Sequence, residues 1–387
     1  MRNPADELRD LDANGLRRRL RRLESPQGVR VRLAGNGECL NFSSNDYLGL
    51  ANDETLKAIY QSHIGTFGAG SGSSRLVCGT MTAHQELEEK IASLKRTEAA
   101  LTFTSGFATA TGALPALCGK EDFLILDKLC HASLIDGARL SGATMRVYPH
   151  NDLNRLESHL KWASQRITGN ARLIVVTESV FSMDGDLAPL AEIVEMKDRY
   201  GALLLVDEAH AFGVLGPEGR GLGAALGFES RIDLQMGTFS KAVGLSGGYL
   251  CCTRAMADLL INRARSFIYS TAPGPALAAT IRDALDVVCG PRGDVLRESL
   301  SANRETFAKN TASAIIPVII GESEAALSAS AQLQEQGFLV PAIRFPTVPK
   351  GSARLRITLS ATHRPEDIAS LKITLAGITN IRYDPSP

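Results

Sequence analysis

The sequence predicts an α/β protein, with a mainly parallel, doubly wound sheet in a large domain and a smaller α+β domain after it. Three observations lead to this prediction. Apolar runs alternate with amphipathic helical patterns from about residue 85 to residue 250. The runs are continuous, as is typical of parallel strands that helices cover on both faces. After about residue 285 this alternation ends, and a strand with a period of two residues at 353–360 indicates a different, smaller domain.

The elements of the large domain follow from the same patterns. Helices are predicted where apolar residues recur every three or four positions, and strands where short apolar runs end in polar residues. The predicted helices span 84–96, 107–117, 131–140, 152–163 and 189–201. The predicted strands span 99–103, 122–127, 144–148, 171–178 and 202–206, followed by one that ends near Thr238 and one that begins at Tyr249.

The smaller domain is predicted to contain strands at 314–321 and 353–360 and helices at 323–337 and 364–378. The helix at 323–337 has a serine suited to cap its start and a glycine suited to end it. We therefore expect a large domain over 41–285 and a small domain over 286–387. The N-terminal segment 1–40 is expected to pack with the small domain.

The composition argues against several classes of protein. The chain has 387 residues, with 42 basic and 42 acidic side chains, so no net field favours nucleic acid or a membrane. Seven cysteines without a C-x-x-C pair indicate buried thiols in a reducing compartment, and neither a disulfide framework nor a zinc or other metal site. The N-terminus has no apolar signal segment and the apolar runs are short, so we expect a cytoplasmic protein. The basic cluster "RRRLRR" at 17–22 is expected to be a solvated helix face.

Ligands of open parallel sheets lie beyond the carboxyl ends of the strands. Applied to the predicted strands, this rule selects five short segments as candidate site residues. They are 105–107, 127–131, 178–184, 207–210 and 238–241.

Two motif matches lack the neighbouring sequence that their functions require. The stretch "GTFGAGSGSSR" at 65–75 contains G-x-G-x-G, but no strand precedes it and its third glycine is misplaced for a dinucleotide site, so a flexible loop is expected. The stretch "VDEAH" at 206–210 is similar to the magnesium-binding strand end of a helicase. The chain has no G-x-x-x-x-G-K-[ST] segment to hold the phosphates of a nucleotide, which argues against that interpretation.

A third match leaves an alternative open. The stretch "GLSGG" at 244–248 fits the nucleophile elbow of a serine hydrolase, with Ser246 as nucleophile and His363 as a later histidine. An elbow requires a helix after the serine, whereas "YLCCT" is a strand pattern. A loop that leads into a strand is the favoured interpretation.

The strand ends taken together fit a fourth interpretation, a site for a phosphorylated pyridine aldehyde. Such a cofactor needs a lysine amine for a Schiff base, and Lys241 lies after a strand end. It needs a carboxylate for its ring nitrogen, which Asp207 supplies. It also needs backbone N–H groups at a helix start for its phosphate, and Ser105, Gly106 and Phe107 begin a predicted helix.

Several longer motifs extend this pattern over nearly the whole chain. They are "NFSSNDYLGL" (41–50), "TSGF" (104–107), "CHASLIDG" (130–137), "ESVFSMDGDLAPL" (178–190), "VDEAHAFGVLGPEGRG" (206–221) and "GTFSKAVG" (237–244). With them the sequence resembles the α-oxoamine synthases, which are fold-type I enzymes dependent on pyridoxal 5′-phosphate. These enzymes join an amino acid to an acyl thioester with loss of CO2. The resemblance implies a homodimer with shared active sites.

The resemblance also implies roles for particular residues. Lys241 forms the Schiff base and later removes the Cα proton of the amino acid, for which the pKa of its amine has to fall. Asp207 pairs with the pyridine nitrogen, His210 reaches the ring hydroxyl and His131 stacks on the ring. The other residues assigned to the cofactor are Gly106, Phe107 (tyrosine in many relatives), Ser182, Thr238 and, across a dimer interface, Ser270 and Thr271.

The substrate residues come partly from strand periodicity. Arg354 and Arg356 alternate with apolar residues in the strand at 353–360, and a guanidinium suits a substrate carboxylate, for which Arg356 is the candidate. By resemblance, Arg17, Asn45, His131 and Thr347 are assigned to the substrates.

The segment "PAIRFPTVPKGSARLRITL" at 341–359 is most similar to the members of the family that act in biotin synthesis. It implies condensation of L-alanine with a pimeloyl thioester carried by coenzyme A or acyl carrier protein. A member that uses glycine, of the aminolevulinate or aminoketobutyrate type, is the alternative within the family. A serine hydrolase acting through Ser246 and a binding protein without catalysis are the alternatives outside it.

Overall fold

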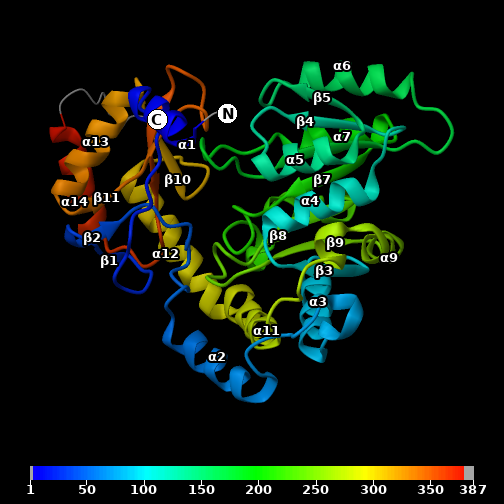
Figure 1. Cartoon of the computed structure of the whole chain (residues 1–387), viewed down its shortest axis with the longest axis horizontal. Helices are drawn as coiled ribbons and strands as arrows, with labels where there is room; N and C mark the ends of the chain where they lie inside the picture. Colours follow the sequence, from blue (N-terminus) through cyan, green and yellow to red (C-terminus); the bar gives the residue numbers. More distant parts are fainter. Residues whose placement is uncertain (1–2, 379–387) are drawn as a thin grey trace. The chain divides into compact units, whose positions relative to one another are not determined.

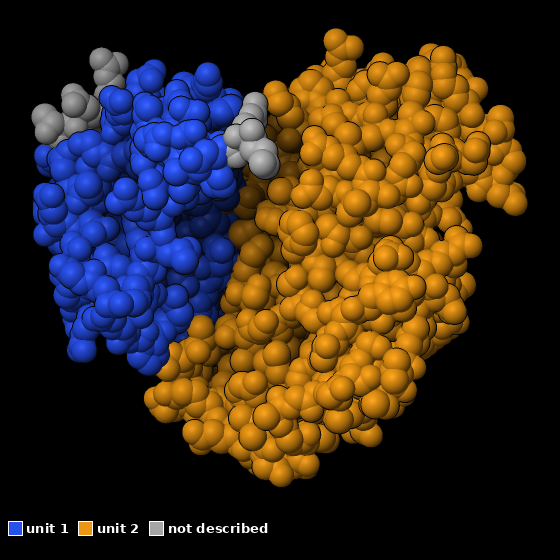
Figure 2. Space-filling view, viewed as in Figure 1, with its two compact units in different colours: residues 1–49, 183–185, 298–387 blue, residues 50–182, 186–297 orange. Residues whose placement is uncertain are grey.

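In the computed structural model, which describes residues 3–378, the chain divides into two units (Figure 2). Unit 1 comprises residues 1–49, 183–185 and 298–387, and unit 2 comprises residues 50–182 and 186–297. Residues 41–49 fall in unit 1 because Phe42 N–H donates to the Leu339 carbonyl at 3.0 Å and the Phe42 carbonyl accepts from Thr358 N–H at 2.9 Å. Unit 2 extends to Arg297, whose guanidinium donates to the Val288 carbonyl at 2.6 Å. The predicted domain boundaries were 40/41 and 285/286.

A seven-stranded sheet forms the centre of unit 2, with the order β3-β9-β8-β7-β6-β4-β5 (Figure 1). β9 pairs antiparallel with both of its neighbours, and the other pairs are parallel. The strands are β3 (Ala99–Phe103), β4 (Phe123–Asp127), β5 (Thr144–Tyr148), β6 (Leu173–Glu178), β7 (Leu203–Asp207), β8 (Leu234–Thr238) and β9 (Gly248–Cys252). Every residue of β3, β4, β6, β8 and β9 is buried, as the continuous apolar runs predict.

Helices cover both faces of this sheet. Leu124 and Leu126 of β4 share a core with Leu114 of α4 and Leu134 of α5. The alternate residue Phe123 packs edge-on against Trp162 of α6, with ring centroids 5.7 Å apart. The helices are α2 (Glu54–Phe67), α3 (Thr82–Leu94), α4 (Gly106–Leu117), α5 (Ala132–Ser141), α6 (Leu153–Ser164), α7 (Leu190–Arg199), α8 (Leu222–Ala225), α9 (Arg254–Arg263), α10 (Arg265–Ile268) and α11 (Pro275–Cys289). The predicted doubly wound α/β architecture is confirmed.

Two details of the predicted large domain were wrong. The segment 65–67, expected to belong to a flexible loop, is the end of α2, which Asp53 begins by accepting a hydrogen bond from Leu56 N–H. The predicted thiols are not all buried, because Cys78 is exposed; all seven cysteines are free. Across residues 3–378, no helix combines the length and hydropathy that a bilayer crossing requires.

Unit 1 contains two three-stranded sheets, with the orders β1-β2-β11 and β10-β13-β12. Its strands are β1 (Arg30–Leu33), β2 (Gly37–Asn41), β10 (Ile315–Gly321), β11 (Phe338–Leu339), β12 (Ala342–Ile343) and β13 (Ala353–Thr358). Its helices are α1 (Pro4–Ala13), α13 (Ser323–Glu335) and α14 (Pro365–Gly377), and α12 (Pro291–Phe307) crosses the boundary between the units. The predicted serine cap of α13 was wrong, because the capping position is Glu322 and no side chain caps the helix. Residues 17–22 form no helix, so the predicted solvated helix face was also wrong.

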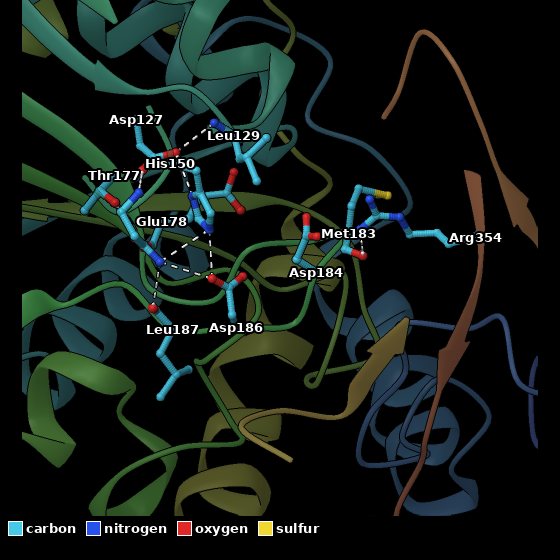
Figure 3. Close-up of polar contacts among 11 residues, drawn as sticks. Asp127, Leu129, His150, Thr177, Glu178, Met183, Asp184, Asp186, Leu187 and Arg354 are labelled. Carbon is cyan, nitrogen blue, oxygen red and sulfur yellow. Dashed lines mark hydrogen bonds and ion pairs between the residues drawn. The ribbon is translucent and has the colours of Figure 1, made fainter. Parts of the chain in front are cut away.

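The two arginines of β13 are buried, with 5% of each exposed. Arg354 Nη1 forms an ion pair with Asp184 Oδ1 at 2.5 Å and donates to the Met183 carbonyl at 3.3 Å (Figure 3). The neighbouring Gly185 has φ +73°, and a Cβ there would lie 2.1 Å from the Ile315 carbonyl oxygen. Residues 183–185 therefore pack within unit 1, although the chain on both sides of them belongs to unit 2.

Candidate active site

One cavity of about 230 Å³ in unit 2 is lined by residues from all five strand-end segments. The carboxyl ends of parallel strands meet at one edge of a sheet, and β3, β4, β6, β7 and β8 all end at this cavity. The lining residues are Ser105, Gly106, Phe107, His131, Ser133, Glu178, Asp207, Ala209, His210, Met236, Thr238, Ser240 and Lys241. Another cavity of unit 2, of about 490 Å³, is lined by residues of α3, β3 and α9 and by none of the predicted site residues.

The first turn of α4 forms one wall of the smaller cavity. Ser105 has an extended backbone and its Oγ accepts a hydrogen bond from Ala108 N–H at 3.0 Å, which starts the helix at Gly106. The first N–H groups of a helix have no partner within it and attract anions. The first turn carries no acidic residue. Thr238 lines the same wall, and its Oγ1 donates to the Gly247 carbonyl at 2.6 Å.

Two buried carboxyl groups lie at the ends of adjacent strands. Asp207 and Glu178 are the last residues of β7 and β6, and they are partners in the strand register. Asp207 Oδ1 accepts from Ala209 N–H at 2.9 Å, and Glu178 Oε1 accepts from His131 N–H at 2.5 Å. Burial raises the pKa of both groups, and the charge of Asp207 contributes further to a pKa of about 8 for Glu178, while Lys241 opposes both shifts. Burial and the charge of Asp207 therefore favour the protonated form of Glu178 over its ionised form.

His131 is the N-cap of α5. Its Nδ1 accepts a hydrogen bond from Ser133 N–H at 3.2 Å and lies 2.8 Å from Ser133 Oγ. Burial lowers the pKa of His131, and the charge of Lys241 lowers it further against the opposing effect of Asp207. The ring is therefore neutral at pH 7 and carries its proton on Nε2.

In the turn from Asp207 to His210, Glu208 has a structural role. Both carboxylate oxygens of Glu208 accept backbone hydrogen bonds, from Leu222 N–H at 2.8 Å and from Gly223 N–H at 2.9 Å. Glu208 thus holds the start of α8, which accounts for the acidic residue in "VDEAH" without a metal. His210, with 6% exposed, lines the cavity together with Lys241.

Of the substrate residues assigned from the sequence, His131 lines the cavity in unit 2, and the others lie in unit 1. Arg356 Nη1 donates to Asn45 Oδ1 at 3.1 Å and to Thr358 Oγ1 at 2.9 Å, so the structure brings Arg356 and Asn45 together. Arg17 pairs with Asp12 at 2.5 Å, whereas Thr347 accepts a hydrogen bond from Arg18 at 3.2 Å.

Three residues assigned to the cofactor do not line the cavity. They are Ser182, Ser270 and Thr271. Thr271 instead forms an isolated antiparallel bridge with Ser74.

The geometry argues against the serine hydrolase. β9 begins at Gly248, directly after "GLSG", so no helix follows Ser246. His363 accepts a hydrogen bond at Nδ1 from Ser360 N–H at 2.9 Å, and its Nε2 contacts the Asn41 carbonyl at 3.1 Å. Burial lowers the pKa of His363 to about 4. Both ring nitrogens hold the backbone of unit 1, so His363 is no general base.

Sequence comparison identifies the family. Residues 37–372 match the family "Aminotransferase class I and II". The chain belongs to this family. It is 46% identical to the 8-amino-7-oxononanoate synthase of Citrifermentans bemidjiense over 374 residues, which cover 94% of this chain and 95% of the relative. It is also 46% identical to the enzyme of the same name from Geobacter sulfurreducens, over 97% of this chain and 98% of the relative.

Solved structures of two enzymes agree with this membership of the aminotransferase class I and II family. A serine palmitoyltransferase from S. paucimobilis, solved with a bound aldimine of PLP (pyridoxal 5′-phosphate) and myriocin, has a TM-score of 0.88 and 28% identity, covering 96% of this chain and 95% of that chain. An 8-amino-7-oxononanoate synthase from Francisella tularensis has a TM-score of 0.72 and 28% identity, covering 87% of this chain and 96% of that chain. The chain is therefore an α-oxoamine synthase, an acyltransferase that depends on PLP and has the fold-type I architecture.

Sequence reasoning gave no role to several residues of the cavity. Glu178 belonged to a selected segment, and its place at the end of an apolar run was the signal that could have found it. Ser133 and Ser240 lie two residues from His131 and Thr238, and each bonds to that neighbour, at 2.8 Å in both cases. No pattern in the sequence separates such supporting hydroxyls from ordinary surface serines.

Proposed function

We propose that this protein condenses L-alanine with a pimeloyl thioester to give 8-amino-7-oxononanoate, CO2 and the free carrier thiol, with PLP bound covalently to Lys241. The observation that carries the proposal is the single cavity that holds Lys241, the buried Asp207 and the first turn of α4. The names of the closely related enzymes support the choice of reaction. A homodimer in which Ser270 and Thr271 of a second copy reach the cofactor phosphate belongs to the same proposal.

The residues present fit the cofactor. Asp207 is buried, with 6% exposed, and its carboxylate suits a protonated ring nitrogen. The N–H groups of Gly106 and Phe107 open a helix without acidic neighbours and suit a phosphate. The flat ring of His131 suits stacking on the cofactor ring, and His210 lies in the same lining for the ring hydroxyl.

When bound, PLP withdraws electrons from the alanine Cα, so that Cα can lose first a proton and, after condensation, the carboxylate as CO2. The Lys241 amine, released by alanine, takes the Cα proton and forms an ammonium. Arg356, already oriented by Asn45 and Thr358, binds the alanine carboxylate through two parallel N–H donors. Arg17 and Thr347 are proposed to contact the acyl substrate.

The substrate choice is tested by product formation from pimeloyl, succinyl, acetyl and palmitoyl thioesters, each offered with alanine, glycine or serine. We expect the pair of pimeloyl thioester and alanine to give the highest kcat/KM. Glycine lacks only a methyl group, which discriminates by about 1–3 kcal/mol, so some turnover of glycine is compatible with the proposal. Faster turnover of a succinyl or palmitoyl donor with glycine or serine would contradict the assignment.

Gly248→Ala tests the phosphate site. A Cβ at Gly248 would lie 2.5 Å from Thr109 Oγ1 and 2.7 Å from the Gly106 nitrogen, so it pushes on the first turn of α4. We expect the Kd for PLP, measured by absorption titration of the apoprotein, to rise about tenfold, a loss of about 1.4 kcal/mol. Gly119→Ala is the control, because a Cβ there meets nothing within 4 Å. Equal affinities of the two variants would argue against a phosphate at this turn.

A further inference from the structure

His150 lies between two carboxylates, those of Asp127 and Asp186. It follows β5, and 24% of its side chain is exposed. Its Nδ1 is 3.0 Å from Asp127 Oδ1 and its Nε2 is 2.8 Å from Asp186 Oδ2. Both residues are labelled beside His150 in Figure 3. The ring of Phe181 packs edge-on against the imidazole, with centroids 4.3 Å apart. Both ring nitrogens are therefore in contact with an acceptor, and the ring is fixed.

Asp127 connects His150 to the turn that carries His131. Asp127 is fully buried and ends β4. The oxygen that contacts His150 also accepts from Leu129 N–H at 2.7 Å, and the other oxygen accepts from Asn151 N–H at 2.9 Å. The turn held in this way runs directly into His131, which lines the cavity. Asp127 thus sets the path of the backbone before His131.

Asp186 connects His150 to the loop 180–187, which contains Ser182. The loop is closed at its base by a bridge between Val180 and Leu187. The Asp186 oxygen that contacts His150 also accepts from Asn151 Nδ2 at 3.1 Å, and Asn151 Nδ2 donates to the Leu187 carbonyl at 3.2 Å. The residues His150 and Asn151 therefore hold the turn at β4 and the loop before α7 together.

The two carboxylate contacts of His150, at 3.0 and 2.8 Å, are shorter than the contact of its Nε2 with the donor Asn151 Nδ2 at 3.3 Å, and they favour the form of the imidazole that donates to both carboxylates. A neutral ring has one N–H donor and one lone pair, so it would direct a lone pair at one of the two carboxylates. A doubly protonated ring donates to both. The charged groups that face His150 are Asp127 from β4 and Asp186 from the loop. Burial alone would lower the pKa of His150, but the hydrogen bonds and charges of Asp127 and Asp186 outweigh burial and raise it to about 10.

We propose that His150 is a positioning residue that ties the turn before His131 to the loop containing Ser182, by donating one hydrogen bond from each ring nitrogen to a different carboxylate. His150 does not line the cavity. Its effect on catalysis is transmitted through the backbone of the two segments. This effect rests on the proposed function, whereas the protonation of His150 does not.

The protonation is measured by nitrogen NMR of the 15N-histidine-labelled holoenzyme without substrates. His150→Gln identifies the His150 signals by their loss. We expect both ring nitrogens of His150 to carry a proton at pH 8, where an ordinary histidine is neutral. In Asp186→Asn, we expect the midpoint of the His150 titration to fall by at least about one pH unit. A singly protonated His150 in the wild-type protein at pH 8 would overturn the proposal.

The positioning role is measured by steady-state kinetics of His150→Gln and Asp186→Asn. Small displacements of positioned groups are costly, so we expect kcat to fall about 10–100-fold in each variant, with the visible spectrum of the cofactor retained. His159→Gln in α6 is the control and should leave kcat within about twofold. A kcat close to wild type in both test variants would overturn the role. If the wild-type protein does not make the proposed product, the proposed function is wrong, and the NMR experiment still decides whether His150 donates both hydrogen bonds.

Discussion

Lys241→Ala is expected to abolish turnover and the covalent attachment of the cofactor. Lys241 lines the cavity with Asp207 and His131, three residues after the end of β8. Its amine is assigned both the bond to PLP and the removal of the Cα proton. Since alanine can do neither, we expect kcat to fall by roughly 10⁴-fold. In the wild-type protein, borohydride reduction should bleach the visible absorption and leave a pyridoxyl group on the peptide that contains Lys241.

Lys161→Ala is the matched control, because Lys161 is exposed on α6 and outside the cavity. It should keep both the absorption and the turnover of the wild-type protein. Turnover of Lys241→Ala within tenfold of the wild type would contradict the assigned base. A pyridoxyl label on another lysine would contradict the assigned attachment. Acylation of Ser246 would instead support the serine hydrolase, although both ring nitrogens of His363 contact backbone groups.

The glycines around Lys241 also have a physical explanation. Gly244 has φ +74°, and a Cβ there would lie 2.5 Å from the Ala51 nitrogen. Gly247 has φ +120°, and Gly248 is in close contact with the start of α4. The chain after Lys241 thus turns sharply and returns as β9 beside both β8 and β3. A pattern that fits a nucleophile elbow is accounted for by close backbone packing.

The position of the candidate site could be predicted from the sequence because the cavity lies where the topology brings the strand ends together. Continuous apolar runs fix a parallel sheet, and a parallel sheet brings the carboxyl ends of its strands to one edge. Asp207 and Lys241 are far apart in the chain, yet both follow directly from that rule. The first turn of α4 was predictable for the same reason, since Ser105 follows β3 and caps the helix.

The features that could not be predicted depend on contacts between residues that are far apart in the sequence. The raised pKa of Glu178 results from burial beside Asp207, and only the register of β6 and β7 reveals that pairing. Thr347 accepts its hydrogen bond from Arg18, whereas Arg17 was assigned to the same substrate as Thr347. The two arginines lie in an irregular segment, so no helical or strand periodicity indicates which of them faces Thr347. The roles of His150 and His363 likewise depend on partners from distant elements.

Asp207→Asn should bind the cofactor but turn over at least about 10²-fold more slowly than the wild type. The asparagine oxygen can keep the hydrogen bond from Ala209 N–H, which is 2.9 Å long in the wild-type protein, so the turn at the end of β7 is retained. What is lost is the negative charge beside the pyridine nitrogen. A neutral amide does not hold the proton on that nitrogen, and the ring then withdraws electrons from the alanine Cα less strongly.

Glu208→Gln is the matched control for Asp207→Asn, because it also replaces a buried carboxylate by an amide, one residue further along. Glu208 holds the Leu222 and Gly223 N–H groups and does not line the cavity, so we expect a loss of stability of about 1–2 kcal/mol with kcat within a few-fold of wild type. Steady-state kinetics and urea unfolding of both variants separate a loss of turnover from a loss of stability. Because the charge of Asp207 contributes to the raised pKa of Glu178, its removal should also lower that pKa. Near-normal turnover of Asp207→Asn would mean that Asp207 only accepts the Ala209 hydrogen bond and that the cofactor ring is held elsewhere.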